Sequence, residues 1–387
     1  MIYVYIIANF LFLRSIIKRH IPFTNIFIFI YWGFMLLYPL SIYSIYALDI
    51  SEYASSEMSY LLGNKSIVDA VLQSASIALC TFGILMIIKP IKRENIKTFP
   101  LYNIKRYKIL YLVLFPLVLY LNSITNWTTD RAGLLPSMAA YSRNIMTVLA
   151  VLLIIPQNIS IKNKLFYLFL FMIITFTSTQ RTNALIVIIA LVYTLRSSKM
   201  AIRVAFLGLL ALIVLGSIRN NQGATNLLFP ILGEGLFGAW GLLQAIEISS
   251  DTSYSWSQFF MLFNEFLNWI FQTFHLPISL PTLGELVSNK GLTYYPMGGF
   301  FYLSDAYLMH PILGPIVYTF FIYFIYRQCA NNYYLNHTPL SLICLSLLFD
   351  AVKGSICVFM VMLIFHILSY YVTLFIVRFK KLNKNVY

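Results

Sequence analysis

Four arginines lie at or near the ends of long apolar runs, where a charged side chain needs an explanation. They are Arg131, Arg143, Arg181 and Arg219. A guanidinium group keeps its proton, and its planar fork makes two parallel hydrogen bonds to a phosphate. Four such groups indicate a pocket for a polyanion. The alternative is that each side chain only reaches into water or pairs with an acid such as Asp130, and we favour this alternative for Arg131.

A second set of reactive side chains lies in the segment PMGGFFYLSDAYLMHPILGPIVY, residues 296–318. Asp305 could act as a general base, because its surroundings can tune a carboxylate at a membrane boundary. The same residue, with Ser304, could instead cap a helix, and the two roles are compatible. The candidate substrate-binding residues of this segment are Tyr302, Tyr307 and His310. For His310 we favour a polar residue packed beside a proline kink over a base.

Further titratable residues lie between residues 219 and 302. They are Glu234, Glu247, Glu265, His275 and Glu285. Any of them could be the base, and their spacing does not rank them. Glu247 and His275 are kept as candidate substrate-binding residues. The chain has no Walker loop, no cytoplasmic DxD pair and no His/Cys cluster, so we expect neither a metal nor a cofactor.

The composition decides where these residues must sit. The chain of 387 residues is 60% hydrophobic and only 10% charged, against about 25% charged residues in soluble proteins. Long apolar runs recur from end to end, which predicts an all-α polytopic membrane protein. The four cysteines show no paired spacing, and three lie within apolar runs. We interpret them as packing residues rather than disulfides or metal ligands.

About eleven membrane-spanning helices are predicted from the apolar runs. The first run has no small-residue cleavage site, so we expect a retained helix rather than a signal peptide. Several spans are shorter than the ~20 residues of a full crossing. The predicted spans are residues 1–17, 23–48, 67–88, 109–126, 138–156, 165–178, 182–195, 203–218, 303–326, 338–352 and 355–377.

The charges predict an orientation with the N-terminus outside and the C-terminus in the cytoplasm. In this orientation 20 of the 27 basic residues lie inside and 12 of the 13 acidic residues lie outside, as the positive-inside rule requires. The net charge of +14 is then an orientation signal, and nucleic acid binding is not needed to explain it. The seven basic residues left outside include all four arginines named above.

One large extramembrane segment, residues 219–302, is predicted outside. It contains two apolar runs, residues 226–246 and 256–274, and the aromatic residues of the second run have helical spacing. We favour amphipathic helices that lie on the outer interface or re-enter it; two further true spans would preserve the same parity. This segment separates the N-terminal transmembrane helices, residues 1–218, from the C-terminal helices and basic tail, residues 303–387.

This combination resembles the O-antigen polymerase (Wzy) family of oligosaccharide repeat-unit polymerases. The stretch STQRTNALIV is similar to the family's Ser/Thr-x-Arg turn before an apolar helix, and Arg219 opens a large outer loop after the next span. The loop's exit reads DAYLMHPILG, against Glu-x-Tyr-x-Asn-Phe-Gly-x-x-Gly in the family, so Tyr307 and Gly314 match. The departures are Asp305, Met309, His310 and Pro311.

The resemblance implies a GT-C-like architecture and a glycosyltransferase in the bacterial inner membrane. Such an enzyme transfers a growing glycan from undecaprenyl pyrophosphate to the next lipid-linked repeat unit on the outer face. Arg181 and Arg219 would stabilise the pyrophosphate leaving group, Asp305 would be the catalytic carboxylate, and Arg143 would bind substrate. The implied partners are the lipid-linked oligosaccharide, membrane lipid and a chain-length regulator protein.

Two alternatives stay open. An O-antigen ligase has the same loop and arginines but uses a lipid A core acceptor, and in that family a histidine of the outer loop carries much weight. His275 is the only histidine between Arg219 and Asp305, and its context is not one we recognise. A non-enzymatic flippase or transporter should have internal repeats or intramembrane charges. We see no repeat, and Asp69 and Asp350 both fall near predicted outer ends.

Overall fold

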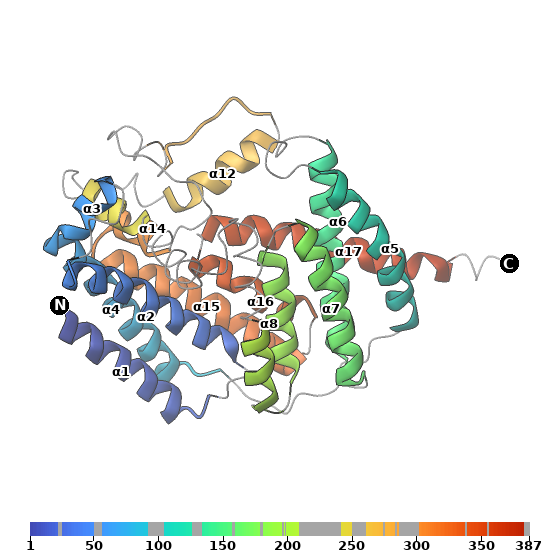
Figure 1. The fold of residues 1–387 in the computed structure, drawn as a ribbon, viewed down its shortest axis with the longest axis horizontal. Helices are drawn as coiled ribbons and strands as arrows, with labels where there is room; N and C mark the ends of the chain where they lie inside the picture. Colours follow the sequence, from blue (N-terminus) through green and yellow to red (C-terminus); the bar gives the residue numbers. More distant parts are fainter. Residues whose placement is uncertain are drawn as a thin grey trace.

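The structure is a computed structural model, in which the described part of the chain is helical and contains no β-strand (Figure 1). The described residues are 1–21, 25–49, 56–91, 104–125, 134–156, 159–178, 181–195, 197, 199–208, 241–249, 261–273, 275–282, 285, 302–336, 339–353 and 356–382.

The described residues of the apolar runs predicted to cross the membrane are mostly helical. The helices of the N-terminal part are α1 (Ile2–Lys18), α2 (Ile26–Ala47), α3 (Ser56–Gly63), α4 (Lys65–Ile88), α5 (Ile104–Ile124), α6 (Leu134–Ile154), α7 (Ile161–Ser178) and α8 (Arg181–Thr194). A further stretch, residues 199–208, is also helical. The later helices are α12 (Met261–Thr273), α14 (Tyr302–Met309), α15 (Leu313–Asn336), α16 (Pro339–Lys353) and α17 (Ile356–Leu382).

Four helices are long and apolar enough to cross a membrane. Their candidate spans are Ile26–Ala47, Lys65–Ile88, Ile104–Ile124 and Phe359–Val377, while shorter apolar helices occupy Met138–Ile154, Asn183–Thr194 and Pro339–Val352. The three shorter ones belong to α6, α8 and α16, and most of their apolar side chains are buried. Helices enclosed by protein do not face lipid along their length, so the bilayer thickness constrains them less directly. The total of eleven spans stays a prediction.

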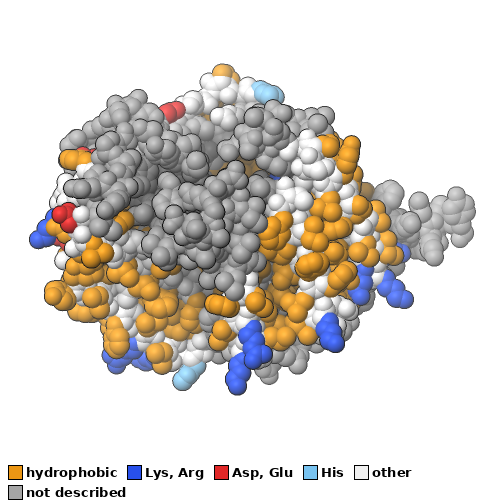
Figure 2. All heavy atoms as spheres, in the orientation of Figure 1, with side chains coloured by type: hydrophobic (Ala, Val, Ile, Leu, Met, Phe, Trp, Pro, Cys, Tyr) orange, Lys and Arg blue, Asp and Glu red, His pale blue; other side chains and the backbone are white. Residues whose placement is uncertain are grey.

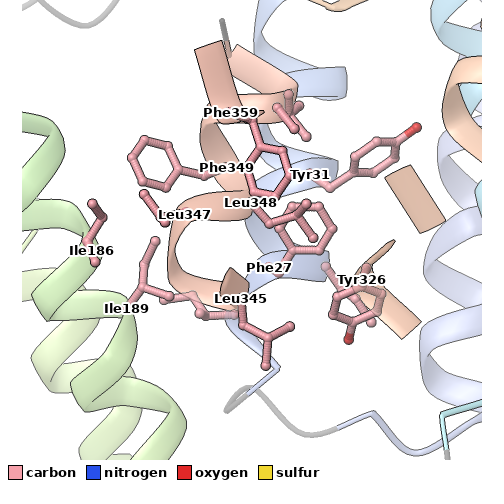
Figure 3. Packing of buried hydrophobic residues seen from close by; sticks show 14 of the residues in the cluster. Phe27, Tyr31, Ile186, Ile189, Tyr326, Leu345, Leu347, Leu348, Phe349 and Phe359 are labelled. Carbon is pink, nitrogen blue, oxygen red and sulfur yellow. The ribbon is translucent and has the colours of Figure 1, made fainter. Parts of the chain in front are cut away.

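The middle of the bundle is built around α16. Leu345, Leu347 and Leu348 of this helix are each 1% exposed or less. Figure 3 shows them between side chains of α8, including Ile186, and side chains of α2, including Phe27. A helix that is apolar on all sides is stable only when other elements surround it. This explains why the apolar residues of α16 show little amphipathic pattern in the sequence.

The prediction of one continuous helix over residues 303–326 is wrong. The segment forms α14 and α15, joined by a tight turn at residues 310–312. Pro311 has no N–H to continue α14, and it disfavours helical geometry at the residue before it. Gly314 closes the turn, because a Cβ at this position would lie 1.6 Å from the carbonyl oxygen of Ala306. Only glycine fits there.

Neighbouring helices run in the directions that the alternating spans predict. The N-terminal amino group of α1 lies 3.5 Å from the Asp69 carboxylate near the start of α4. Arg19, after the end of α1, donates a hydrogen bond to the carbonyl of Ile87 near the end of α4. Likewise the Tyr111 hydroxyl of α5 donates to the carbonyl of Tyr167 of α7, and Asn122, further along α5, donates to the carbonyl of Ile174, further along α7. Each of these pairs is therefore parallel, as expected of helices separated by one return crossing.

The charged side chains are segregated on the visible face of the molecule. Figure 2 shows hydrophobic side chains in a band across its lower half and right side, most Lys and Arg side chains at the lower and right margins, and acidic side chains towards the upper left. In the same orientation α12 lies across the top of the bundle (Figure 1). We call the end that carries α12 the outer end, since the basic side chains gather at the opposite end as the predicted orientation requires.

The helix α12 does not cross the bundle. Its described part has 13 residues and lies across the top of the bundle in Figure 1, whereas a full crossing needs ~20. The chain then reverses at His275, whose φ is 54°, and residues 276–282 return along the helix. Asn268 holds the returning segment: its side chain donates to the carbonyl of Leu280 and accepts from the N–H of Leu280, both at 2.8 Å. This geometry agrees with an interfacial or re-entrant helix.

Candidate functional site

The predicted arginine pocket is described only in part. Arg181 is the first residue of α8, at the outer tip of the α7–α8 hairpin, and its side chain lies outside the described atoms. Arg131 and Arg219 lie outside the described residues. Arg143 is described, and at 1% exposed it is among the largest fully buried side chains. The site is therefore built from Arg143 outwards.

Arg143 lies nearer the middle of its helix than the predicted outer turn implies. The helix α6 begins at Leu134, four residues before the predicted span, and Pro136 is tolerated in a first helical turn. Arg143 therefore occupies the third turn, roughly 14 Å along the helix axis from Leu134. Its helix packs against α5, α7, α8 and α17. An arginine enclosed by apolar membrane helices is a functional candidate in its own right.

Other polar side chains are buried in α6 and in helices that pack against it. They are Asn144 of α6, Asn183 of α8, Asp350 of α16 and His366 of α17, each between 0% and 8% exposed. Their helices contact one another, α6 with α8, α16 and α17, and α16 with α8 and α17. We call Arg143 and these four residues the outer polar layer. Burying such groups is costly without compensation, so the layer is the best candidate for a functional site.

An aromatic contact places two members of the layer at one depth. Phe365 of α17 packs edge-on against Tyr141 of α6, with ring centroids 5.5 Å apart. It also packs against Trp269 of α12, at 5.6 Å. Arg143 follows Tyr141 by two residues and His366 follows Phe365 by one, so both lie within roughly 3 Å of this contact along their helices. Helix α12 therefore packs on α17, whose Phe365 in turn contacts α6.

The two ring nitrogens of His366 have different surroundings. Nδ1 lies 2.8 Å from the carbonyl oxygen of Met362, and a carbonyl can only accept, so Nδ1 carries the proton. In the neutral imidazole, Nε2 then presents a lone pair. This atom is buried, and it has no hydrogen-bond partner within the part of the chain that the structure describes. A buried acceptor of this kind calls for an explanation such as a catalytic role or an absent ligand.

The turn between α14 and α15 carries three of the predicted residues. Asp305 is half-buried in the first turn of α14, a position that suits helix capping and leaves its role as a base a prediction. Tyr307 is half-buried and packs against the core. The Nδ1 atom of His310 accepts hydrogen bonds from the N–H groups of Ile312 and Leu313, at 3.1 and 3.2 Å. His310 therefore caps the start of α15, which agrees with the favoured packed interpretation.

Tyr302 lies in a closed network rather than on a surface. Its side chain is 0% exposed, and its hydroxyl lies 2.9 Å from the hydroxyl of Tyr31 and 2.9 Å from that of Thr319. These bonds tie α14 to α2 and α15. The predicted contact of Tyr302 with substrate stays untested, but the hydroxyl already has partners within the core.

The remaining predicted residues lie on the outer segment. Glu247 is half-buried in the helix formed by residues 241–249, which also holds the buried Gln244. His275 is exposed at the turn after α12. Glu285 is exposed and accepts from the N–H of Thr282.

Sequence reasoning missed His366 and gave little weight to Asp350. The signal was present as a lone polar residue inside a long apolar run, in LIFHILS and in SLLFDAV. Nothing in the local spacing distinguishes these residues from isolated packing residues. Only the structure shows that their helices, α16 and α17, pack against α6, which carries Arg143.

Among the described residues, no group of three or more His, Cys, Asp or Glu side chains is placed to hold a metal ion. Comparison with known proteins adds no relative, because no family model, no curated protein and no solved structure matches the chain. The function therefore has to be argued from the residues and their surroundings.

Proposed function

We propose that the protein is a membrane glycosyltransferase that polymerises undecaprenyl-pyrophosphate-linked oligosaccharide repeat units into O-antigen or a related surface polysaccharide. The reaction would occur at the outer face of the bacterial inner membrane. The observation that carries the proposal is Arg143, a guanidinium group 1% exposed within apolar helices, at the depth where α12 packs. A cation held there is suited to an anionic head group whose tail lies in lipid.

The proposed reaction joins two lipid-linked glycans. A sugar hydroxyl of the incoming repeat unit attacks the anomeric carbon of the growing glycan, and the bond from that carbon to the pyrophosphate oxygen breaks. Undecaprenyl pyrophosphate leaves with the bonding electron pair. Arg143 and Arg181, with Arg219, would stabilise the charge that develops on it. The proton of the attacking hydroxyl passes to a base.

Two residues compete for the role of base. Asp305 is half-buried at the outer end of α14, where a substrate can reach it without displacing a helix. His366 offers the lone pair of Nε2 at the depth of Arg143, but from a fully buried position. Asp305 is favoured because it is more exposed. His366 is favoured because it lies at the depth of Arg143, which is proposed to bind the pyrophosphate.

Purified protein in liposomes, supplied with radiolabelled undecaprenyl-pyrophosphate-linked repeat units, tests the proposal. We expect a ladder of longer glycans and released undecaprenyl pyrophosphate, with no lipid A core present. Arg181→Ala should lower the rate roughly 10- to 150-fold, the effect of losing one charge-assisted hydrogen bond of about 1.5–3 kcal/mol. Arg181→Lys should be intermediate, because lysine keeps the charge but not the planar fork. Product formed only with a core acceptor would indicate a ligase.

A matched control is available at the other end of the bundle. Arg19→Ala removes a guanidinium group that donates to the backbone carbonyl of Ile87, far from the proposed head-group site, and should leave the rate unchanged. Asp305→Asn tests the base: it should abolish turnover if Asp305 accepts the proton, and cost little if it only caps α14, since Asn caps about as well as Asp.

A transporter of lipid-linked oligosaccharide is the second candidate, and one observation favours it. Asp350 and His366 are ionisable and at most 6% exposed inside the bundle, and buried ionisable groups mark proton and substrate pathways in transporters. In the same liposomes, movement of the labelled lipid to the opposite leaflet without glycan growth would support transport and contradict the polymerase.

A further inference from the structure

Two of the four cysteines meet in the structure although 15 residues separate them in the sequence. Cys329 lies on α15 and Cys344 on α16, and their Sγ atoms are 2.8 Å apart. Both are free thiols; Cys344 is buried and Cys329 is half-buried. Interpreting the cysteines as separate packing residues misses this contact. Their spacing has no recognisable pattern, and the hairpin of α15 and α16 brings the two thiols together.

We propose that Cys329 and Cys344 form a reversible disulfide that links α15 to α16, with a small-molecule disulfide such as oxidised glutathione as the oxidant. Helices α15 and α16 pack against each other, and no third atom fits between sulfur atoms at this separation. Bond formation therefore requires only a small approach of two side chains on helices that are already in contact.

The surroundings of Cys329 give an oxidant access to the pair. Around it, α15 changes from the apolar run that precedes residue 327 to the polar stretch RQCANN. Gln328 and Asn332 are exposed, and Arg327 is partly exposed. A cysteine bordered by exposed polar residues can ionise, and the thiolate is the form that attacks a disulfide. Cys329 is thus the attacking thiol, and the buried Cys344 is the resolving thiol.

The exchange balances in two steps. The Cys329 thiolate attacks one sulfur of oxidised glutathione, forming a mixed disulfide and releasing one glutathione thiolate. The Cys344 thiolate then attacks Sγ of Cys329, forming the protein disulfide and releasing the second glutathione. The protein loses two protons and two electrons, and the oxidant gains them as two glutathione molecules.

The pair lies at the end of the bundle predicted to face the cytoplasm, so its resting state is the dithiol. Oxidation would join α15 to the central helix α16, which carries Asp350 of the outer polar layer near its other end. The proposal does not depend on the proposed glycosyltransferase activity. It concerns a different end of the bundle and is tested by thiol chemistry alone.

The experiment counts free thiols in the full-length protein in detergent. After incubation with oxidised glutathione, the protein is denatured and labelled with a maleimide that adds a large polymer to each thiol. We expect labelling to fall from four thiols to two. Trypsin should release residues 328–353, which contain both cysteines and follow Arg327, with a mass lower by two hydrogen atoms. Chymotrypsin, which cuts after Tyr333 and Tyr334, should give two fragments joined by a reducible bond.

Single variants separate the two steps. Cys344→Ser should trap one glutathione on Cys329, whereas Cys329→Ser should leave Cys344 reduced, because the buried thiol cannot reach the oxidant. Cys80, a half-buried thiol on α4, should stay reduced in every variant. Retention of all four thiols in the wild-type protein, or a disulfide that involves Cys80 or Cys357, would overturn the proposal. The wild-type measurement decides the matter even if a variant fails to fold.

Discussion

Two regions of the bundle are buried to the same degree but treat their polar groups differently. In the aromatic core, formed by Phe27, Tyr31, Phe82, Tyr302 and Tyr326, the ring of Tyr31 stacks on Phe82 with centroids 4.3 Å apart. The Tyr31 hydroxyl is 2.9 Å from that of Tyr302, which in turn contacts Thr319. The outer polar layer instead buries the ionisable residues Arg143, Asp350 and His366.

This difference indicates that the aromatic core stabilises the fold, whereas the outer polar layer serves the function. The described hydroxyls of Tyr31 and Tyr302 bond to each other and to a neighbour, and neutral hydroxyls are inexpensive to bury once paired. Ionisable groups are much more costly to bury among membrane helices, so a chain that keeps them must gain something else. Substitutions around the aromatic core should therefore lower stability and leave the activity of each folded molecule unchanged. Substitutions in the outer polar layer should lower the activity of each folded molecule and leave the stability unchanged.

The largest effect is expected at Gly314, where α14 joins α15 beside the aromatic core. Gly314→Ala places a Cβ 1.6 Å from the Ala306 carbonyl oxygen, so the turn must open and the α14–α15 packing is lost. A cost above about 4 kcal/mol is expected. Size-exclusion chromatography of the protein in detergent should show aggregate in place of a single folded species.

Gly33→Ala is the matched control for this change. Gly33 lies within α2, and nothing lies within 4 Å of a Cβ added there. Alanine in a helix interior is favoured over glycine by roughly 0.5–1 kcal/mol, so this variant should unfold at the same temperature as the wild type or slightly above it. A normal elution profile for Gly314→Ala would show that the turn can rearrange.

Arg143 gives the sharpest test of the outer polar layer. Arg143→Met keeps an unbranched side chain but removes the charge, and should lower the rate of glycan growth roughly 100-fold or more, if two charge-assisted hydrogen bonds of about 1.5–3 kcal/mol each are lost. Arg143→Lys should retain part of the rate. Rates in liposomes are compared per molecule of folded protein. A wild-type rate in Arg143→Met would show that this arginine is a structural residue. The outer polar layer would then not differ in function from the aromatic core.

The sequence predicts most of the helices because lipid imposes a simple rule on them. Apolar runs of sufficient length form helices, and the predicted bounds of α2 and α16 differ from the observed ones by three residues or fewer. A proline kink beside His310 is predicted but the full break is not, since the tight turn depends on how the Gly314 backbone fits against Ala306. The apolar pattern on both sides of the break is continuous.

The candidate site was predicted less well, for a physical reason. Unusual arginines can be found one at a time, because each breaks the charge bias of its own loop. The position of Arg143 within its helix depends on where α6 begins. Whether His366 belongs to the candidate site depends on which helices pack against α17. A single sequence does not record those contacts.

His366 tests the second ionisable group of the layer. His366→Asn leaves a side-chain N–H near the position of Nδ1, so the bond to the Met362 carbonyl can persist while Nε2 is lost. His366→Phe loses both nitrogens. If Nε2 accepts the proton, both variants should slow glycan growth about 100-fold or more, the usual contribution of a general base. If His366→Asn keeps the wild-type rate and His366→Phe does not, the rate depends on the hydrogen bond to Met362. His366 would then be a structural residue and not the base.

The smallest effect is expected where α1 meets α2, in the structural half of the comparison. Pro39 lies inside α2 and has no N–H, so the carbonyl of Met35, four residues earlier, loses its helical partner. The hydroxyl of Tyr5 donates to this carbonyl at 2.5 Å and lies 2.9 Å from the carbonyl of Leu36. One tyrosine of α1 therefore satisfies the acceptor that a proline of α2 leaves open.

Tyr5→Phe should destabilise the protein by about 1–3 kcal/mol, the cost of leaving a buried carbonyl without a donor, while each folded molecule keeps its activity. Tyr3→Phe, at a tyrosine 80% exposed on the same helix, should have no effect. Pro39→Ala restores the missing N–H, so Tyr5→Phe should cost less in that background than in the wild type. Thermal unfolding of the four proteins of this double-mutant cycle measures the difference. If Tyr5→Phe lowers the stability equally with and without Pro39, the hydrogen bond from Tyr5 does not compensate for the proline. Tyr5 would then stabilise the contact between α1 and α2 by packing alone.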